Sequence, residues 1–381
     1  MPEKFAVIGR GLIGSAAARH LAEQGHDVIL IGPSEPENKP EHKGVFGSHY
    51  DEGRITRSLD PWPFWSRVSR ASISRYRQIE ARSGVPFFSE VGVIMAGPKD
   101  AALINQVDEI AEREAIACTR YEGSALAQDF PYFDFPKDTL ALYEPGNSGH
   151  VSPRALVRAQ GIAAQKAGAR IMGAVVHELD EVADQVRIVT DQGGVNADRV
   201  LVAAGGFSNM VLPEPLPLSV YARTVALFEV SEEEAARLHD MPSMIYLLPT
   251  GEDPYLLPPI RYPDGKFYLK LGGDTADVAL PDAEATKAWF RSGGSEEVAA
   301  FLEAMIREWM PGLSILSRHH QACVTTYTEQ NIPLLQPVSD RISVAVAGCG
   351  RGAKCSDELG RLGAEVVLGH DLPAWAHEAA V

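Results

Sequence analysis

The first segment whose residue types and spacing suit chemistry is the glycine motif GRGLIG at residues 9–14. It follows a short apolar run at 5–8 and opens an alanine-rich stretch that we expect to be helical. In such a strand–turn–helix unit, Gly9 permits the tight turn, Gly11 lets a pyrophosphate approach the backbone, and Gly14 lets the helix pack closely. The helix N-terminus then offers N–H groups to the phosphates. The motif predicts dinucleotide binding, and the alternative is a glycine turn with a purely structural role.

The acidic residue that usually accompanies this motif is missing. An Asp or Glu that binds the ribose hydroxyls is expected about twenty residues further on. The second apolar run, at 28–31, ends instead at Gly32, which has no carboxylate. Two alternatives stay open: Ser34 or Glu35 of the following loop makes the ribose contact, or the contact does not exist.

Cations recur in two further segments that suit a reaction site. GSHYDEGRITR at 47–57 ends in two arginines, and a guanidinium can donate two parallel charge-assisted hydrogen bonds to a carboxylate. In KFYLKLGG at 266–273, Lys270 has apolar neighbours, so burying it is costly unless it stabilises a charge that develops during a reaction. The alternatives are two solvated arginines on a polar loop and an outward-facing strand lysine.

The segment HHQACVTTYTEQNIPLL at 319–335 places Cys323 just before β-branched residues. This cysteine is either a small buried thiol or a covalent anchor for a cofactor. A metal site is not expected, because the adjacent histidines of a strand point to opposite faces. Near the far end of the chain, GCGRGAK at 348–354 is a second glycine loop, and a site split between distant loops suits a long cofactor such as FAD better than a nicotinamide.

Composition and charge limit the possible partners. The chain has 381 residues, of which 45% are hydrophobic and 23% charged, as in an ordinary globular protein. A formal charge of −16 argues against nucleic acid or an anionic membrane surface as a partner. The four cysteines form no CxxC pair, the first residues lack the pattern of a signal peptide, and no apolar run is long enough to span a membrane. We therefore expect a protein of the reducing cytoplasm.

Periodicity predicts two kinds of architecture along the chain. A βαβ unit is expected at the start, a strand at 199–206 ends in two glycines, and the chain returns to a strand, glycine loop and helix at 342–369. Between residues 215 and 317 alternating strands indicate an antiparallel second domain. Further expected elements are helices at 13–24, 65–81, 99–113, 153–167 and 295–308, a strand or hairpin at 86–98, and strands at 169–179, 186–190, 222–230, 243–249 and 266–273.

With these motifs in place, nearly the whole chain resembles the FAD-dependent amine oxidases of the monomeric sarcosine oxidase and N-methyltryptophan oxidase group, within the D-amino acid oxidase superfamily. The resemblance implies an α/β protein with an α+β second domain: a Rossmann-type FAD-binding domain and an antiparallel-sheet substrate domain. We expect the FAD-binding domain to comprise residues 1–83, 150–214 and 320–381, and the substrate-binding domain residues 84–149 and 215–319.

The resemblance also implies residue roles. Arg54 would lie against the isoalloxazine ring, Arg57 and Lys354 would bind a substrate carboxylate, and Lys270 would activate oxygen, while Cys323 would form a thioether to the flavin. The cofactor-binding residues expected are Gly9, Gly11, Leu12, Ile13, Gly14, Ser48, His49, Arg54, Ile55, Val175, Gly205, Cys323, Gly348, Gly350, Arg351, Gly352 and Lys354.

Three positions depart from the family pattern near the expected substrate pocket. Thr325 replaces a tyrosine, Asp274 stands where a histidine is usual, and Arg351 also replaces a histidine. The additional cation at Arg351 would favour a dianionic or longer acidic substrate, or alternatively stabilise the anionic reduced flavin. These departures leave the identity of the substrate open.

The function that the resemblance implies is an FAD-dependent oxidase of a secondary amine or N-methyl amino acid, with molecular oxygen as acceptor and hydrogen peroxide as product. One alternative is an enzyme of the same fold that oxidises primary or D-amino acids, or a dehydrogenase that passes electrons to a carrier. A more distant alternative is a nicotinamide-linked dehydrogenase or a nucleotide-binding protein without catalysis.

Overall fold

The computed structural model describes residues 3–377. The helices are α1 (Leu12–Glu23), α2 (Pro63–Ile73), α3 (Tyr76–Ser83), α4 (Ala102–Arg113), α5 (Ser124–Asp129), α6 (Pro153–Lys166), α7 (Glu232–Arg237), α8 (Ala283–Ser292), α9 (Glu296–Trp309) and α10 (Gly352–Leu368), with 3-10 helices η1 (Gly205–Met210) and η2 (Ala374–His377). The strands are β1 (Lys4–Ile8), β2 (Asp27–Ile31), β3 (Arg54–Thr56), β4 (Phe88–Ser89), β5 (Val93–Pro98), β6 (Thr119–Glu122), β7 (Thr139–Glu144), β8 (Gly149–Val151), β9 (Arg170–Met172), β10 (Val176–Val182), β11 (Gln185–Thr190), β12 (Gly193–Ala197), β13 (Arg199–Val202), β14 (Ser219–Val230), β15 (Ser243–Tyr246), β16 (Tyr255–Arg261), β17 (Phe267–Gly272), β18 (Val278–Ala279), β19 (Ser317–Tyr327), β20 (Leu334–Pro337) and β21 (Ile342–Val346).

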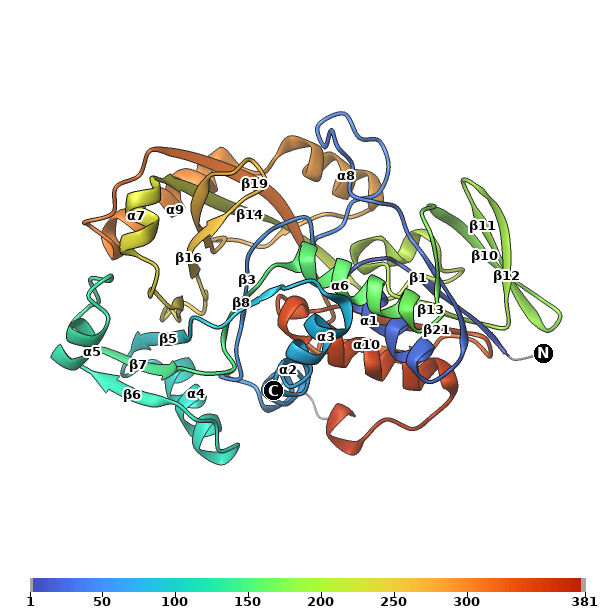
Figure 1. Cartoon of the computed structure of the whole chain (residues 1–381), viewed down its shortest axis with the longest axis horizontal. Helices are drawn as coiled ribbons and strands as arrows, with labels where there is room; N and C mark the ends of the chain where they lie inside the picture. The colour runs from blue at the N-terminus through green and yellow to red at the C-terminus, as the bar shows by residue number, and fades with distance from the viewer. Residues whose placement is uncertain (1–2, 378–381) are drawn as a thin grey trace.

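A mainly parallel sheet of order β20-β21-β13-β1-β2-β9 forms one end of the elongated molecule (Figure 1). Successive side chains of β1 point into two different cores. Phe5 and Val7 pack with α1, whereas Ala6 and Ile8 pack with the separate antiparallel sheet β10-β11-β12. Helix α10 can approach α1 closely because Gly360 has no side chain, and a Cβ there would lie 2.5 Å from that of Ala16.

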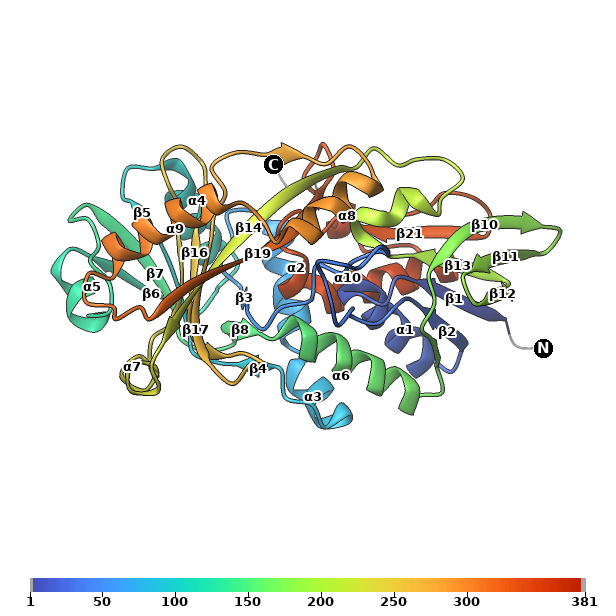
Figure 2. The same cartoon turned by 90° about the horizontal axis from the view of Figure 1, so that it is seen from above.

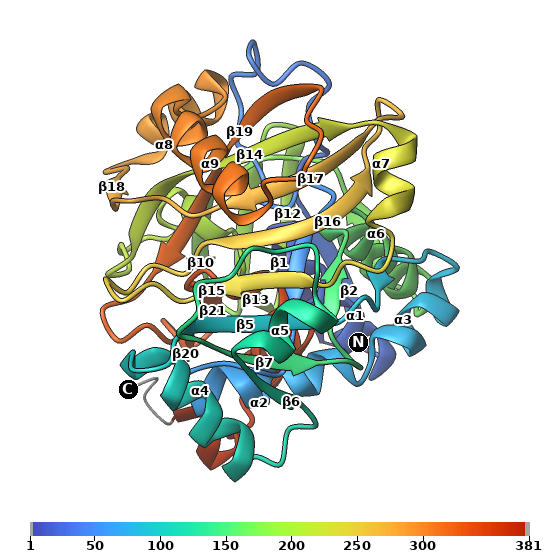
Figure 3. The same cartoon turned by 90° about the vertical axis from the view of Figure 1, so that its left-hand side faces the viewer.

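A large mixed sheet forms the other end of the molecule. Figure 3 looks at this end of the molecule, and the strands run across the view in the order β18-β14-β17-β16-β15-β5-β7-β6, with β19 paired to β14. Strand β5 buries residues on both faces: Ile94 packs in the core that includes Leu302 of α9, and Val93 packs in the core that includes Val107 of α4. The pairing is antiparallel except between β15 and β5, which broadly agrees with the antiparallel sheet expected from the sequence.

The two ends are joined by long strands. Figure 2 shows β14 and β19 side by side, reaching from the large sheet toward the parallel sheet. Strands β3 and β4 flank β8 in a small sheet. The predicted fold class, an α/β nucleotide-binding part with an α+β second part, is confirmed.

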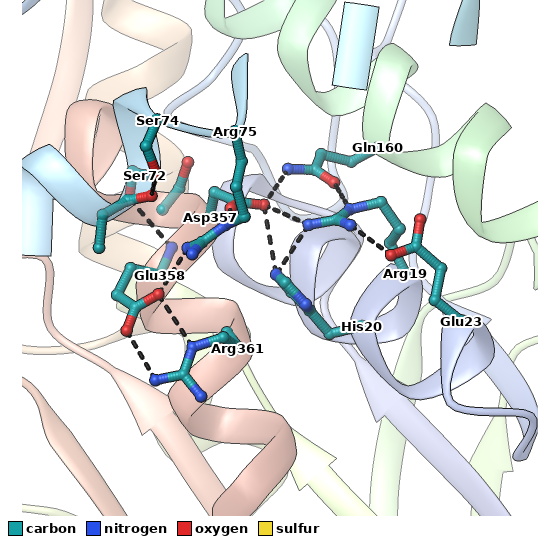
Figure 4. A network of polar contacts seen from close by, with 12 residues as sticks. Arg19, His20, Glu23, Ser72, Ser74, Arg75, Gln160, Asp357, Glu358 and Arg361 are labelled. Carbon is teal, nitrogen blue, oxygen red and sulfur yellow. Dashed lines mark hydrogen bonds and ion pairs between the residues drawn. The ribbon is translucent and has the colours of Figure 1, made fainter. Parts of the chain in front are cut away.

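A buried ion cluster joins α1, α3, α6 and α10 (Figure 4). Asp357 of α10 lies at its centre and accepts hydrogen bonds from Arg19 at 2.6 Å, Arg75 at 2.5 Å and Gln160 at 2.8 Å. Burial on its own disfavours the charged form, but His20, Arg19 and Arg75 outweigh it and lower the pKa of Asp357 far below its ordinary value. The cluster fixes the helices that cover the parallel sheet.

Three predicted elements differ from the structure. The element expected at 86–98 is neither one strand nor a hairpin, because β4 and β5 belong to different sheets. The helix expected at 65–81 is two helices, α2 and α3, because the chain turns at Ser74, whose hydroxyl bonds a backbone carbonyl, and at Arg75, which reaches α10. The strand expected at 169–179 divides at Gly173 into β9 and β10, which belong to different sheets. Among the described residues, none of the helices is both long and apolar enough to cross a membrane.

Candidate functional site

The turn between β1 and α1 needs its glycines for steric reasons. Gly9 has φ +109, and a Cβ there would lie 2.4 Å from the carbonyl oxygen of Ala203. A Cβ at Gly14 would lie 1.9 Å from the carbonyl oxygen of Gly9. At Gly11 the nearest atom would be His49 Nδ1, at 3.8 Å, so this backbone stays accessible from the adjacent cavity.

That adjacent cavity, of about 260 Å³, runs along the carboxyl end of the parallel sheet. We call it the nucleotide cavity. Most of the predicted cofactor-binding residues line it: Gly9, Gly11, Leu12, Ile13, Ser48, His49, Arg54, Val175, Gly205, Cys323, Gly348, Gly350 and Gly352. Gly14 is not part of this lining, since it packs beneath the turn. An apolar wall that the sequence did not predict is formed by Val45, Phe46, Ala174, Phe207 and Met210.

Gly32 cannot carry the missing acid. A Cβ at this position would lie 2.5 Å from the backbone nitrogen of Arg10. Of the two alternatives in the loop, Glu35 is held by Arg154, at 2.7 and 2.8 Å, and by Lys39, at 2.9 Å. Ser34 receives a long hydrogen bond of 3.4 Å from Arg10. A ribose contact from Glu35 would therefore compete with two ion pairs.

A second, larger cavity of about 1050 Å³ lies against the first. We call it the substrate cavity, after the role that the sequence predicts for its residues. The predicted residues Arg54, Ile55, Arg57, Cys323, Arg351 and Lys354 line it. Residues shared by both cavities are Arg54, Cys323, Thr325, Gly350 and Ala353. Residues that the sequence did not point to include Arg223, Asp253, Tyr255 and Tyr327.

Cys323 lies on β19, where the two cavities meet. Its thiol is buried, and its Sγ receives a hydrogen bond of 3.3 Å from Arg54 Nη2. The indole N–H of Trp289 holds the Cys323 carbonyl at 2.9 Å, which fixes the backbone of the strand. A thiol at this junction is accessible from both cavities.

Lys270 lies on β17 and is fully buried. It lines neither the nucleotide cavity nor the substrate cavity. Its Nζ donates to Asp51 Oδ2 at 2.5 Å and to the Gly53 carbonyl at 2.7 Å. Asp51 also pairs with Arg54 and accepts a hydrogen bond of 2.9 Å from Tyr262. Burial, and then the Arg54 guanidinium, lower the pKa of Lys270 well below its ordinary value, while Cys323 acts in the opposite direction. Asp51 was not among the residues predicted from the sequence.

The remaining predicted cations converge on a second overlooked carboxylate, Asp60. Lys354 Nζ lies 2.8 Å from Asp60 Oδ2, Arg351 Nε 3.2 Å, and Arg57 Nη2 3.5 Å. Burial raises the pKa of a carboxyl group, but the three cations outweigh it and hold the pKa of Asp60 well below its ordinary value. The Arg351 guanidinium also stacks on Trp62, 4.2 Å from the ring centre. Arg351 is therefore paired within the protein.

Asp274 lies on the wall of the substrate cavity and accepts a backbone hydrogen bond of 3.0 Å from Thr224. Burial raises the pKa of Asp274 to about 6. An acid whose pKa is higher in the folded than in the unfolded state binds more protons when folded, so stability falls as the pH rises from about 4 to about 6.

Asp274→Asn should therefore stabilise the protein above pH 6 by about 1 to 2 kcal/mol, after allowance for solvent in the cavity. The asparagine oxygen can still accept the Thr224 hydrogen bond. The measurement is urea unfolding of both proteins at pH 7.5 and pH 4.5. The difference in free energy of unfolding between the variant and wild type should be smaller at the lower pH. A variant that is less stable at pH 7.5 would show that the charge is stabilised by partners other than Thr224.

The adjacent histidines of β19 contact different partners. Among residues 3–377 there is no group of three His, Cys, Asp or Glu side chains arranged to hold a metal ion. His319 lies beside Ser317 at 3.1 Å, and His320 lies 3.6 Å from Glu296.

Comparisons with known proteins show the family of the chain. Residues 4–366 match the family described as FAD dependent oxidoreductase. The chain is 27% identical to monomeric sarcosine oxidase of Bacillus sp. (strain B-0618), over 95% of this chain and 91% of that protein. It is 25% identical to N-methyl-L-tryptophan oxidase of Yersinia pestis (strain Pestoides F), over 96% and 94%.

Among solved structures, that of NikD, an unusual amino acid oxidase essential for nikkomycin biosynthesis, superposes with a TM-score of 0.74. It covers 96% of this chain and 94% of its own, at 20% identity, which supports the fold alone. The family match extends over almost the whole chain, from the first glycine motif to α10. The chain belongs to the FAD dependent oxidoreductase family.

Proposed function

We propose that the protein is an oxidase of secondary amines or N-methyl amino acids that carry a carboxylate, with oxygen as acceptor. The observation that carries the proposal is the junction of the cavities. Arg54 and Cys323 belong to both, and Arg57 and Lys354 line the substrate cavity near the second glycine loop. Two relatives named as oxidases of sarcosine and of N-methyl-L-tryptophan support the same class of substrate.

The nucleotide cavity fits FAD. The glycine turn leaves room for a pyrophosphate at Gly11, and backbone N–H groups at the start of α1 face the same space. Burial lowers the pKa of His49 to about 4, so its imidazole is neutral at pH 7 and can lie along the cofactor without adding charge. When bound, FAD supplies the acceptor for the electrons of the amine.

The side chains of the protein would bind and orient the substrate and polarise the flavin. Arg57 and Lys354 would hold the substrate carboxylate, and Arg54 would lie against the flavin ring. Lys270 would act on oxygen through its contact with the Asp51–Arg54 pair. The products are an imine, which water hydrolyses to an amine and an aldehyde, and hydrogen peroxide from oxygen.

We propose that the flavin is bound covalently to Cys323. In the wild-type protein the yellow colour should stay with the acid precipitate, whereas Cys323→Ala should release it to the supernatant. Cys118→Ala, at a half-buried thiol that lines neither cavity, is the matched control and should behave as wild type. Release of the flavin from the wild-type protein would show that Cys323 is only a buried thiol and forms no bond to the cofactor.

The proposal includes three further predictions, on the domain division, the cellular compartment and nucleic acid as a partner. The FAD-binding domain comprises residues 1–83, 150–214 and 320–381 and the substrate-binding domain the rest, although β19 is continuous across the boundary at 319–320. The protein works in the reducing cytoplasm, consistent with four free cysteines. Nucleic acid is not a partner.

The rival functions can be separated by turnover in air. We expect peroxide and aldehyde from N-methyl amino acids and much less from the parent primary amino acids, D-amino acids or the N-methyl compounds with an amidated carboxylate. Peroxide from D-amino acids alone would favour the same-fold alternative. Electron transfer to a dye without peroxide would favour a dehydrogenase. The family assignment favours flavin over the nicotinamide alternative.

A further inference from the structure

Asp60 is the acidic side chain that the proposed function leaves without a role. It is fully buried in the turn between β3 and α2, and its Oδ2 is the point on which Lys354, Arg351 and Arg57 converge, at 2.8, 3.2 and 3.5 Å. Its Oδ1 accepts the backbone N–H of Trp62 at 3.2 Å. The protein thus supplies one anion of its own inside the group of cations that lines the substrate cavity.

These cations keep donors for a ligand. Lys354 has three N–H donors and gives one to Asp60. Arg57 gives its Nε–H to Met95 Sδ at 3.2 Å, a weak acceptor, and its contact with Asp60 is long. Both side chains line the substrate cavity. A planar carboxylate there can still receive charge-assisted hydrogen bonds from both.

The charges nearby limit what the cavity can accept. Three cations and Asp60 leave a net charge of +2, and Asp253, exposed on the same cavity wall, interacts electrostatically with Arg351, Arg57 and Asp60. Burial raises the pKa of Asp253 and so disfavours its ionised form. Asp60 is therefore the anion that a second substrate carboxylate would meet, and that carboxylate would find the cations already shared with Asp60.

We propose that Asp60 is a specificity-determining residue that restricts the acidic end of the substrate to one carboxylate. The inference rests on the proposed function and deepens it. It replaces the expectation that Arg351 favours dianionic substrates, because Arg351 shares the Asp60 carboxylate with Lys354 and Arg57 and stacks on Trp62. Like-charge repulsion in a poorly hydrated site is an effective way to reject a ligand.

The test uses the flavin-loaded protein and two non-reacting probes, acetate and malonate, whose dissociation constants are read from changes in the flavin spectrum. Wild type should bind acetate more tightly than malonate. In Asp60→Asn, which keeps the size of the side chain and an acceptor for Trp62, the ratio of the two constants should move toward malonate by about tenfold or more.

Asp277→Asn is the matched control, since it removes a carboxylate from the same cavity that pairs with Arg223 instead of the cluster. It should change the ratio by less than about threefold. Wild type that prefers malonate would overturn the proposal even if Asp60→Asn does not fold, and so would an unchanged ratio in a folded variant.

The two proposals fail in different ways. If no amine is oxidised but the probes show the predicted ratio, the proposed function is wrong and the role of Asp60 stands. If N-methyl amino acids are oxidised and their dicarboxylic analogues are equally good substrates, the function stands and the role of Asp60 is wrong.

Discussion

Replacing Lys270 by methionine should slow the reaction of the reduced protein with oxygen by about 10²- to 10³-fold, while anaerobic reduction of the flavin by substrate stays within about threefold of wild type. Lys270 Nζ lies 2.5 Å from Asp51, which also pairs with Arg54 on the wall of both cavities. A fixed cation stabilises the negative charge that develops on oxygen, and methionine keeps the length of the side chain without that charge. Rapid mixing measures the two half-reactions separately.

The control is Lys266→Met. Lys266 directly precedes the same strand, but its side chain is 52% exposed and pairs with Glu229 at 2.9 Å. Both half-reactions should be unchanged in this variant. Equal losses in the two half-reactions of Lys270→Met would show that Lys270 holds the site together and does not act on oxygen.

Asp357→Asn should destabilise the folded protein by about 3 to 5 kcal/mol. The carboxylate is fully buried and binds Arg19 and Arg75, as Figure 4 shows. An asparagine keeps the shape but leaves two guanidinium groups without their counter-charge. In a thermal scan we expect the midpoint to fall by on the order of 5 °C.

The pH dependence of this effect has a definite sign. The pKa of Asp357 is lowered on folding, so its contribution is present above about pH 4 and is lost as the pH falls below that value. Asp180→Asn is the control, because its pair with Arg187, at 2.8 Å, is exposed on both sides and should cost less than about 1 kcal/mol. An Asp357→Asn variant as stable as this control would contradict the assigned role of the cluster.

The parts of the fold that sequence predicts well are those whose local signals agree with the tertiary structure. The apolar run of β1 indicates a strand, and the glycines at positions 9 and 14 indicate the tight turn and the helix that follow it. The two signals therefore predict the same strand–turn–helix unit. Strand β16 shows the opposite case. Its sequence, YLLPPIR, contains two prolines that argue against a strand, yet the register shift between Leu257 and Ile260 accommodates them.

The site residues that belong to a sequence motif could be predicted. The residues that form ion pairs with side chains far away in the sequence could not. Arg57 and Lys354 are separated by almost the whole chain, and only the family resemblance brought them together. Asp51 and Asp60 were missed because burial and ion pairing cannot be read from a polar loop. A usable signal existed: each of these acids lies three residues from an arginine, Asp51 from Arg54 and Asp60 from Arg57.

The most direct test of the central claim is an absorption spectrum of the protein mixed without oxygen with an N-methyl amino acid, and then exposed to air. We predict that the yellow absorption of the flavin disappears on mixing and returns in air with one equivalent of hydrogen peroxide, and that the parent primary amino acid reduces it far more slowly. A protein without flavin absorption, one reduced only by primary or D-amino acids, or one that stays reduced in air would contradict the claim.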